Sequence, residues 1–168
     1  LQLLNIEFIL LQISVAFSPG LIIALVVNEA VQKGRKNALQ VAYGAATGAI
    51  GITVVTAGVM TYIFSLIPEI LMFIYVFGMI YIIYKGIKTL QDKGDSHEML
   101  GSASFMSGFK INLANPKMWV FYLSVLPLFI TDKTNIFSSL IFLGIVTILI
   151  NLFADISYAL LSSYLFNN

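Results

Sequence analysis

Long uncharged stretches separate the charged residues and restrict what this sequence can fold into. They cover residues 8–28 (21 residues), 37–68 (32), 70–84 (15), 118–131 (14) and 134–154 (21). A transmembrane helix needs about 20 consecutive apolar residues. Only 10 % of the residues are charged, whereas about 25 % is typical of soluble domains. The pattern predicts an integral membrane protein and excludes a soluble globular domain.

The apolar stretches predict helices rather than strands, since runs such as 145–150 (Ile-Val-Thr-Ile-Leu-Ile) lack the polar/apolar alternation of a membrane barrel. We expect an all-α integral membrane protein with five transmembrane helices, at about 5–30, 39–65, 69–90, 106–131 and 136–164. Residues 1–168 would form a single transmembrane domain. The bilayer is therefore the first expected partner.

The basic residues predict the orientation in the cytoplasmic membrane. Seven of the nine fall in the two loops on one side, namely Lys33, Arg35, Lys36, Lys85, Lys88, Lys93 and Lys110. Cytoplasmic loops are enriched in Lys and Arg. This side should be cytoplasmic, which places the N-terminus outside and the 91–104 loop, with His97, inside.

The sequence lacks the residues that several classes of function require. The formal net charge of +1 gives no electrostatic footprint for nucleic acid. Cysteine is absent and His97 is the single histidine, so thiol chemistry, zinc clusters and a membrane-embedded nucleophile–base pair are not expected. We therefore predict a protein that is not an enzyme and that has no cofactor and no metal centre.

Two predicted spans contain a proline where a helix should be continuous. The first break is Ser18-Pro19-Gly20, and the second is Asn115-Pro116-Lys117. Proline removes a backbone donor and clashes with the preceding turn, and freed backbone groups at membrane depth need a polar partner. One interpretation is a pair of simple kinks. The other is a binding site for a transported solute, with Ser18, Asn115 and Lys117 supplying polar atoms.

The placement of the breaks favours the transport interpretation. They fall in oppositely oriented spans, and Pro19 precedes Gly48 by 29 residues while Pro116 precedes Gly144 by 28. Interrupted spans at matching places in two halves point to a site at an inverted-repeat interface. The first repeat would cover about 5–90, and a partial second repeat 105–168.

The last predicted helix carries a polar stripe on one face, made of Gly144, Thr147, Asn151, Asp155, Tyr158 and Ser162. A carboxylate inside a span costs at least about 2.5–3.5 kcal/mol, so Asp155 is a candidate proton carrier or cation partner. It is alternatively an interfacial residue near the cytoplasmic end. Lys117 either snorkels to the surface or faces a substrate carboxylate. Glu7 and Glu29 lie at span ends, where we expect them to contact water.

Small residues in the second predicted helix suggest close helix packing. Gly44, Gly48 and Gly51 share one face, an arrangement that lets another helix approach closely. The alternative is that they line a substrate path.

Ordered motifs resemble the lysine exporter (LysE/RhtB) family of amino-acid efflux transporters. Ser18-Pro19-Gly20 is similar to the family's S-P-G-P, residues 34–38 and 44–48 to its G-R-x-x-G and G-x-x-x-G, and 78–86 to its G-x-x-Y-L-x-Y-x-G. Residues 105–117, which include Asn112, Asn115 and Lys117, resemble F-x-x-G-F-x-x-N-x-x-N-P-K, and 126–129 resemble L-P-x-F. The chain departs from these motifs at Leu21, where a second proline is usual, and at Ala38, where a glycine is usual.

The resemblance implies secondary active export of an amino acid or a similar small zwitterion, driven by a proton or ion gradient. The two breaks, Ser18-Pro19-Gly20 and Asn115-Pro116-Lys117, would present helix ends, amides and the Lys117 ammonium to the substrate carboxylate, and Asp155 would serve the amine or the proton. Asn112 and Asn151 are further candidate residues of the binding and translocation site. The family has six helices, so the five predicted here suggest a missing sixth helix and a homodimer as a possible assembly. A metal-ion exporter of related fold and a structural membrane subunit are the alternatives.

Overall fold

The computed structural model describes residues 6–66, 104–131 and 134–166, together with isolated helical positions between 72 and 87. The predicted helix at 69–90, with its 78–86 motif, falls largely outside the described residues. So does the predicted loop at 91–104, with His97. All regular elements in the described ranges are helical, which confirms the expected all-α class.

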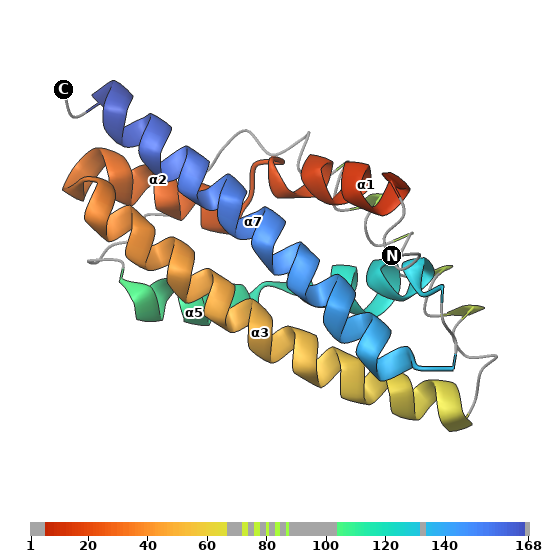
Figure 1. Cartoon of the computed structure of the whole chain (residues 1–168). Helices are drawn as coiled ribbons and strands as arrows, with labels where there is room; N and C mark the ends of the chain where they lie inside the picture. Colours follow the sequence, from red (N-terminus) through yellow and green to blue (C-terminus); the bar gives the residue numbers. More distant parts are fainter. Residues whose placement is uncertain are drawn as a thin grey trace.

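The described helices follow the expected spans but are divided at the prolines (Figure 1). The first span consists of α1 (Ile6–Ala16) and α2 (Leu21–Lys33), and α3 (Arg35–Leu66) is the second. The fourth is divided into α5 (Phe105–Ala114), α6 (Pro116–Val120), the π-helical turn η1 (Phe121–Val125) and the 3-10 turn η2 (Leu126–Phe129). The last span is α7 (Ile136–Phe166).

Two of these helices are individually long and apolar enough to cross a membrane. They are α3 and α7, with 32 and 31 residues, and α1 with α2 forms a third candidate span bent by 50°. The described part of the chain thus supports a membrane protein with two or three strongly apolar spans.

A single glycine replaces the loop expected between the first two spans. Gly34 ends α2 with a φ of 82°, while its N–H donates to the carbonyl of Ala30 at 3.1 Å. This left-handed conformation costs glycine little, because glycine has no β-carbon. The chain reverses there and enters α3 at Arg35, so α2 and α3 pack against each other.

Helix α3 forms the centre of the described bundle, with α5 against one side and α7 against another. The ribbon shows α3 and α7 side by side and running in opposite directions (Figure 1). The backbones of α3 and α5 touch, because a β-carbon on Gly44 would collide with the Phe105 carbonyl and one on Gly108 would collide with the Val41 carbonyl. Small residues at such crossings are what allows helices to pack tightly in lipid.

The contact between α3 and α7 depends on Gly144, where an added β-carbon would collide with the Thr53 side chain. On one side of this crossing lies an apolar cluster that includes Phe8, Ile52, Tyr122 and Leu143. A second cluster, around Leu25, Ala38, Val41 and Ala159, joins α2, α3 and α7. Together they hold α1 and α2 against the α3–α7 pair and thereby position the first helix break.

Candidate functional site

The first helix break is an extended segment between α1 and α2. Pro19 has no N–H to donate to the carbonyl of Val15. The N–H of Ser18 donates to that carbonyl instead, at 3.3 Å. The carbonyl of Phe17 is bonded from another helix, since the Tyr158 hydroxyl donates to it at 3.1 Å. Gly20 caps α2 through its backbone alone and offers no side chain to the helix N-terminus. The first-turn N–H groups of α2 are thus left facing the break.

The second break is compensated by side chains of its own segment. Asn115 ends α5, and its side-chain oxygen accepts from the N–H of Lys117 at 3.0 Å, which caps α6. The carbonyl of Leu113 is released from the helix and accepts from the indole N–H of Trp119 at 2.7 Å. At each break a carbonyl thus accepts a hydrogen bond from an aromatic side chain, Phe17 from Tyr158 and Leu113 from Trp119, which lowers the cost of interrupting a helix at membrane depth.

We expect Trp119→Phe to lower the thermal stability of the detergent-solubilised protein. The ring remains, but the Leu113 carbonyl loses its donor, and leaving such a group unpaired costs about 1–3 kcal/mol. Melting followed by circular dichroism checks this. Tyr62→Phe, which removes an exposed polar group from α3, is the control and should leave the melting temperature unchanged. Equal melting of all three proteins would show that the indole bond is not needed.

The two breaks lie next to each other although they are about a hundred residues apart in the sequence. The Nζ atom of Lys117 is 3.9 Å from the position that a β-carbon on Gly20 would occupy. Lys117 takes part in no ion pair within the described residues. Its ammonium and the uncapped N-terminus of α2 together form a positive site, since helix N-termini carry a partial positive charge.

Helix α7 brings the polar stripe to the same break. Tyr158 bonds the Phe17 carbonyl, and Asn151 accepts from the side-chain amide of Gln12 in α1 at 2.9 Å. Asp155 lies between them on this face and is 7 % exposed. In the described part of the chain its carboxyl group has neither a hydrogen bond nor an ion pair. A carboxylate that is buried and unpartnered inside a span is a functional candidate.

The other predicted site residues separate into two groups. Ser18 and Pro19 are exposed at the first break. Asn112 is buried and donates to the carbonyl of Ala45, so its amide nitrogen is engaged in the contact between α5 and α3. Gly44 and Gly48 lie directly against α5, whereas a β-carbon on Gly51 would make only ordinary contact with Leu113 Cδ2 at 3.8 Å.

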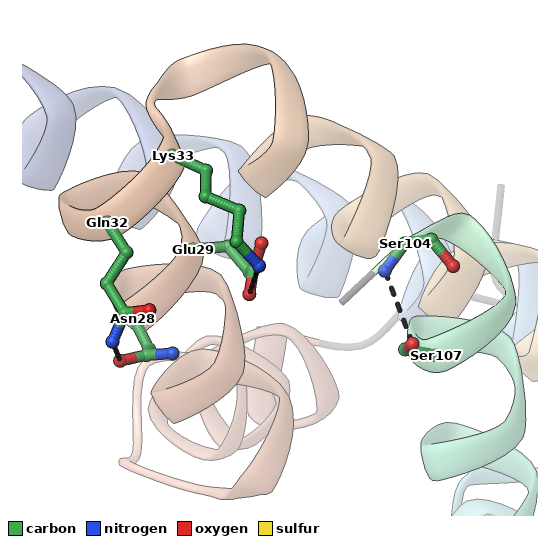
Figure 2. A network of polar contacts seen from close by, with 6 residues as sticks. All are labelled: Asn28, Glu29, Gln32, Lys33, Ser104 and Ser107. Carbon is green, nitrogen blue, oxygen red and sulfur yellow. Dashed lines mark hydrogen bonds and ion pairs between the residues drawn. The ribbon is translucent and has the colours of Figure 1, made fainter. Parts of the chain in front are cut away.

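The expectation that Glu29 contacts water is wrong. Its side chain is 1 % exposed near the end of α2, and Lys33, one turn further on, forms an ion pair with it at 3.2 Å (Figure 2). The adjacent pair Asn28 and Gln32 is bonded on an exposed face of the same helix. Three or more Asp, Glu or His side chains do not come together anywhere in the residues that the structure describes.

Three structural contributors are not evident from the sequence. Gln12 joins α1 to α7, and the Trp119 indole donates to the Leu113 carbonyl at the second break. Gly108 belongs to the 105–117 motif, but its role in the close contact with α3 became evident only from the structure. Gln12 is a polar residue in an apolar helix, which is the one local signal that marks it. Trp119 is the single tryptophan, and nothing in its spacing identifies its partner.

The all-helical bundle, its long apolar spans and its polar-lined breaks define a multi-pass membrane protein. A comparison with protein-family models matches the LysE type translocator family over residues 13–168. The chain belongs to this family, whose members are membrane transporters, and the resemblance noted in the sequence is confirmed. Searches of curated proteins and of solved structures give no match.

Proposed function

We propose that this protein is a secondary active exporter of amino acids or similar small zwitterionic metabolites across the cytoplasmic membrane. The family membership supports export of a small molecule. The zwitterionic substrate is inferred from two side chains that have no ion pair within the described residues, the Lys117 amine and the buried Asp155 carboxyl group. A substrate with both a carboxylate and an amine matches this pair of charges.

The observation that carries the proposal is the contact between the two breaks. Lys117 lies beside Gly20, 3.9 Å from its potential β-carbon, at the uncapped start of α2. A carboxylate there would accept from the ammonium and from first-turn N–H groups, and such charge-assisted bonds are roughly twice as strong as neutral ones. Ser18 and Asn115 flank the position and would complete the carboxylate side of the site.

The opposite end of the substrate is assigned to α7. Asp155 would pair with the substrate amine or carry the exchanged proton, and Asn151 lies one turn away on the same face. Because one carboxylate cannot hold a proton and an ammonium group equally well at once, competition between them would couple export to a proton gradient. This coupling requires no second acidic residue.

The two halves of the molecule would alternate around this site. In transporters built from inverted repeats, one repeat or bundle rocks against the other around a site near the midplane. Here α1–α2 and α5–α6 would be the paired broken helices, with the N-terminus outside and the basic loops in the cytoplasm. A homodimer remains the proposed assembly.

Reconstituted liposomes test the function directly. Vesicles loaded with radiolabelled amino acids should release at least one of them faster than protein-free vesicles, and an inward proton gradient should accelerate the release. Release equal to that from protein-free vesicles for every common amino acid would end the proposal. Faster release of loaded metal ions in the same assay, without amino-acid release, would favour the metal-exporter alternative.

Lys117→Met should raise the KM for the transported amino acid by about tenfold to a hundredfold, since hydrogen bonds to charged groups contribute about 1.5–3 kcal/mol. Transport of the corresponding amine, which lacks the carboxylate, should not change. Counterflow of labelled substrate measures both.

Lys110→Met is the matched control, because Lys110 is an exposed lysine on α5 away from the break. It should keep the wild-type KM. An equal rise in KM in both variants would show that the effect comes from the lost positive charge of the protein as a whole, and not from the position of Lys117 beside Gly20.

A further inference from the structure

Polar side chains that the proposed substrate site does not use lie buried on one side of Asp155. They belong to α1, α3, η1 and α7, and we call them the buried polar cluster: Gln12, Thr53, Thr56, Tyr122 and Thr147. Gln12, Thr56, Tyr122 and Thr147 are each 0 % exposed. Polar groups buried in this way are expensive unless they are bonded.

Three polar atoms of this cluster lack a hydrogen-bond partner among the described residues. They are the Gln12 Oε1 atom and the hydroxyl oxygens of Thr56 and Thr147. The Tyr122 hydroxyl lies beside Thr53, whose own hydroxyl donates to the Ala49 carbonyl at 2.8 Å. Each unpaired buried group costs about 1–3 kcal/mol. The three together point to a small ligand that both donates and accepts hydrogen bonds, as water does.

Two contacts and the helical spacing along α3 and α7 order the groups between Thr56 and Asp155. Thr53 lies against Gly144 on α7, and Thr147 follows Gly144 by one turn. Asn151 is one turn beyond Thr147 and is bonded to Gln12 at 2.9 Å. Asp155 follows after one further turn, about 12 Å along the helix axis from Thr147. Thr56 lies one turn of α3 beyond Thr53 in the opposite direction.

We propose that the buried polar cluster is part of a proton path, in which hydroxyl groups and enclosed water connect Asp155 to Thr56, in the direction of the end of the molecule where α3 ends and α7 begins. This inference rests on the proposed proton-coupled export. In the predicted orientation this end is outside, where an antiporter takes up its proton. The η1 segment that carries Tyr122 is π-helical, a form frequent at functional sites.

The chemistry needs only groups that donate and accept at the same oxygen. A hydroxyl or a water oxygen binds the incoming proton and releases its own proton to the next oxygen. The excess proton ends on the Asp155 carboxylate, and no other bond changes. The charged residues on the helices packed against α7 are Glu7 in α1, Glu29 and Lys33 in α2, and Arg35 and Lys36 in the first turn of α3. None of them lies in the cluster, so Asp155 is the acceptor for this path.

The test compares two transport modes in liposomes. Exchange of labelled for unlabelled amino acid at equal pH needs substrate binding and the conformational change, but no net proton movement. Efflux driven by a proton gradient, with internal pH followed by a trapped dye, also needs the path. Thr147→Val, Thr56→Val and Tyr122→Phe should each keep exchange within about twofold of wild type, whereas the proton-driven efflux should fall by about tenfold.

Two control variants distinguish the path from packing. Thr147→Ser keeps the hydroxyl and should keep the driven efflux. Thr61→Val makes the same replacement on α3, where the hydroxyl already donates to the Ala57 carbonyl at 2.7 Å, and it should leave both modes unchanged.

Other outcomes would overturn the inference. Wild-type driven efflux in a triple variant would show that the path is not needed. Equal loss of exchange and driven efflux would assign the cluster to folding or binding. Driven efflux that follows a sodium gradient instead of pH would make the cluster a cation site. A wild-type chain that exchanges no amino acid would overturn the proposed function together with this inference.

Discussion

Asp155→Asn should abolish gradient-driven efflux and at the same time make the protein more stable. Asn has nearly the same size but neither carries charge nor takes up a proton at physiological pH. Groups that transfer protons contribute about 10²–10⁴-fold to rates, so we expect the driven efflux to fall at least about a hundredfold. Because the carboxyl group is 7 % exposed and has no partner in the described residues, its neutral replacement removes a desolvation cost, and the melting temperature should rise.

Opposite changes in activity and stability distinguish a functional carboxylate from a structural one. Proton-driven efflux from liposomes and melting in detergent give the two measurements. Glu7→Gln is the matched control, since Glu7 is exposed in the first turn of α1, and both quantities should stay at wild-type values. Wild-type efflux in Asp155→Asn would remove Asp155 from the proposed mechanism.

Gly108→Ala should disrupt the close crossing of α3 and α5. The new β-carbon would collide with the Val41 carbonyl and lie 3.1 Å from the Ala45 nitrogen. Both are backbone atoms and cannot rotate away, so the helices must separate. Overpacking costs about 1–3 kcal/mol and occasionally more, and separation would also break the bond from Asn112 to Ala45.

The expected results for Gly108→Ala are a reduced yield of monodisperse protein on size-exclusion chromatography and a clearly lower melting temperature. Gly58→Ala is the control, because no heavy atom lies within 4 Å of its potential β-carbon. Alanine is favoured over glycine within a helix by about 0.5–1 kcal/mol, so this control should be as stable as wild type or slightly more stable. Equal behaviour of the two variants would contradict the close crossing of α3 and α5.

Features that depend on a residue's own chemistry were predictable from the sequence. Proline cannot continue a helix, so the breaks at Pro19 and Pro116 fell where expected and divided two spans. The helical period likewise placed Asn151, Asp155 and Tyr158 on one face, and the structure directs that face toward α1 and the first break.

Features that depend on which helices meet were not predictable in the same way. Gln12 and Asn151 are 139 residues apart, and no local pattern pairs them. Glu29 is buried because neighbouring helices pack over it. Its charge and its place at a span end suggested contact with water, since neither shows which helices are nearby. Lys117 lies near Gly20 only because the two halves of the chain pack together. The one feature of the sequence that suggested this arrangement is the similar position of the two breaks.

Two polar contacts fasten α1 to α7 at the first break, the Gln12 amide to Asn151 and the Tyr158 hydroxyl to the Phe17 carbonyl. The α3–α5 crossing, in contrast, is locked by backbone atoms that touch. Hydrogen bonds change partners readily when water or a solute competes for them, whereas steric contacts do not. The two crossings therefore differ in kind: backbone contact sets the distance between α3 and α5, whereas side-chain hydrogen bonds join α1 to α7 at the first break.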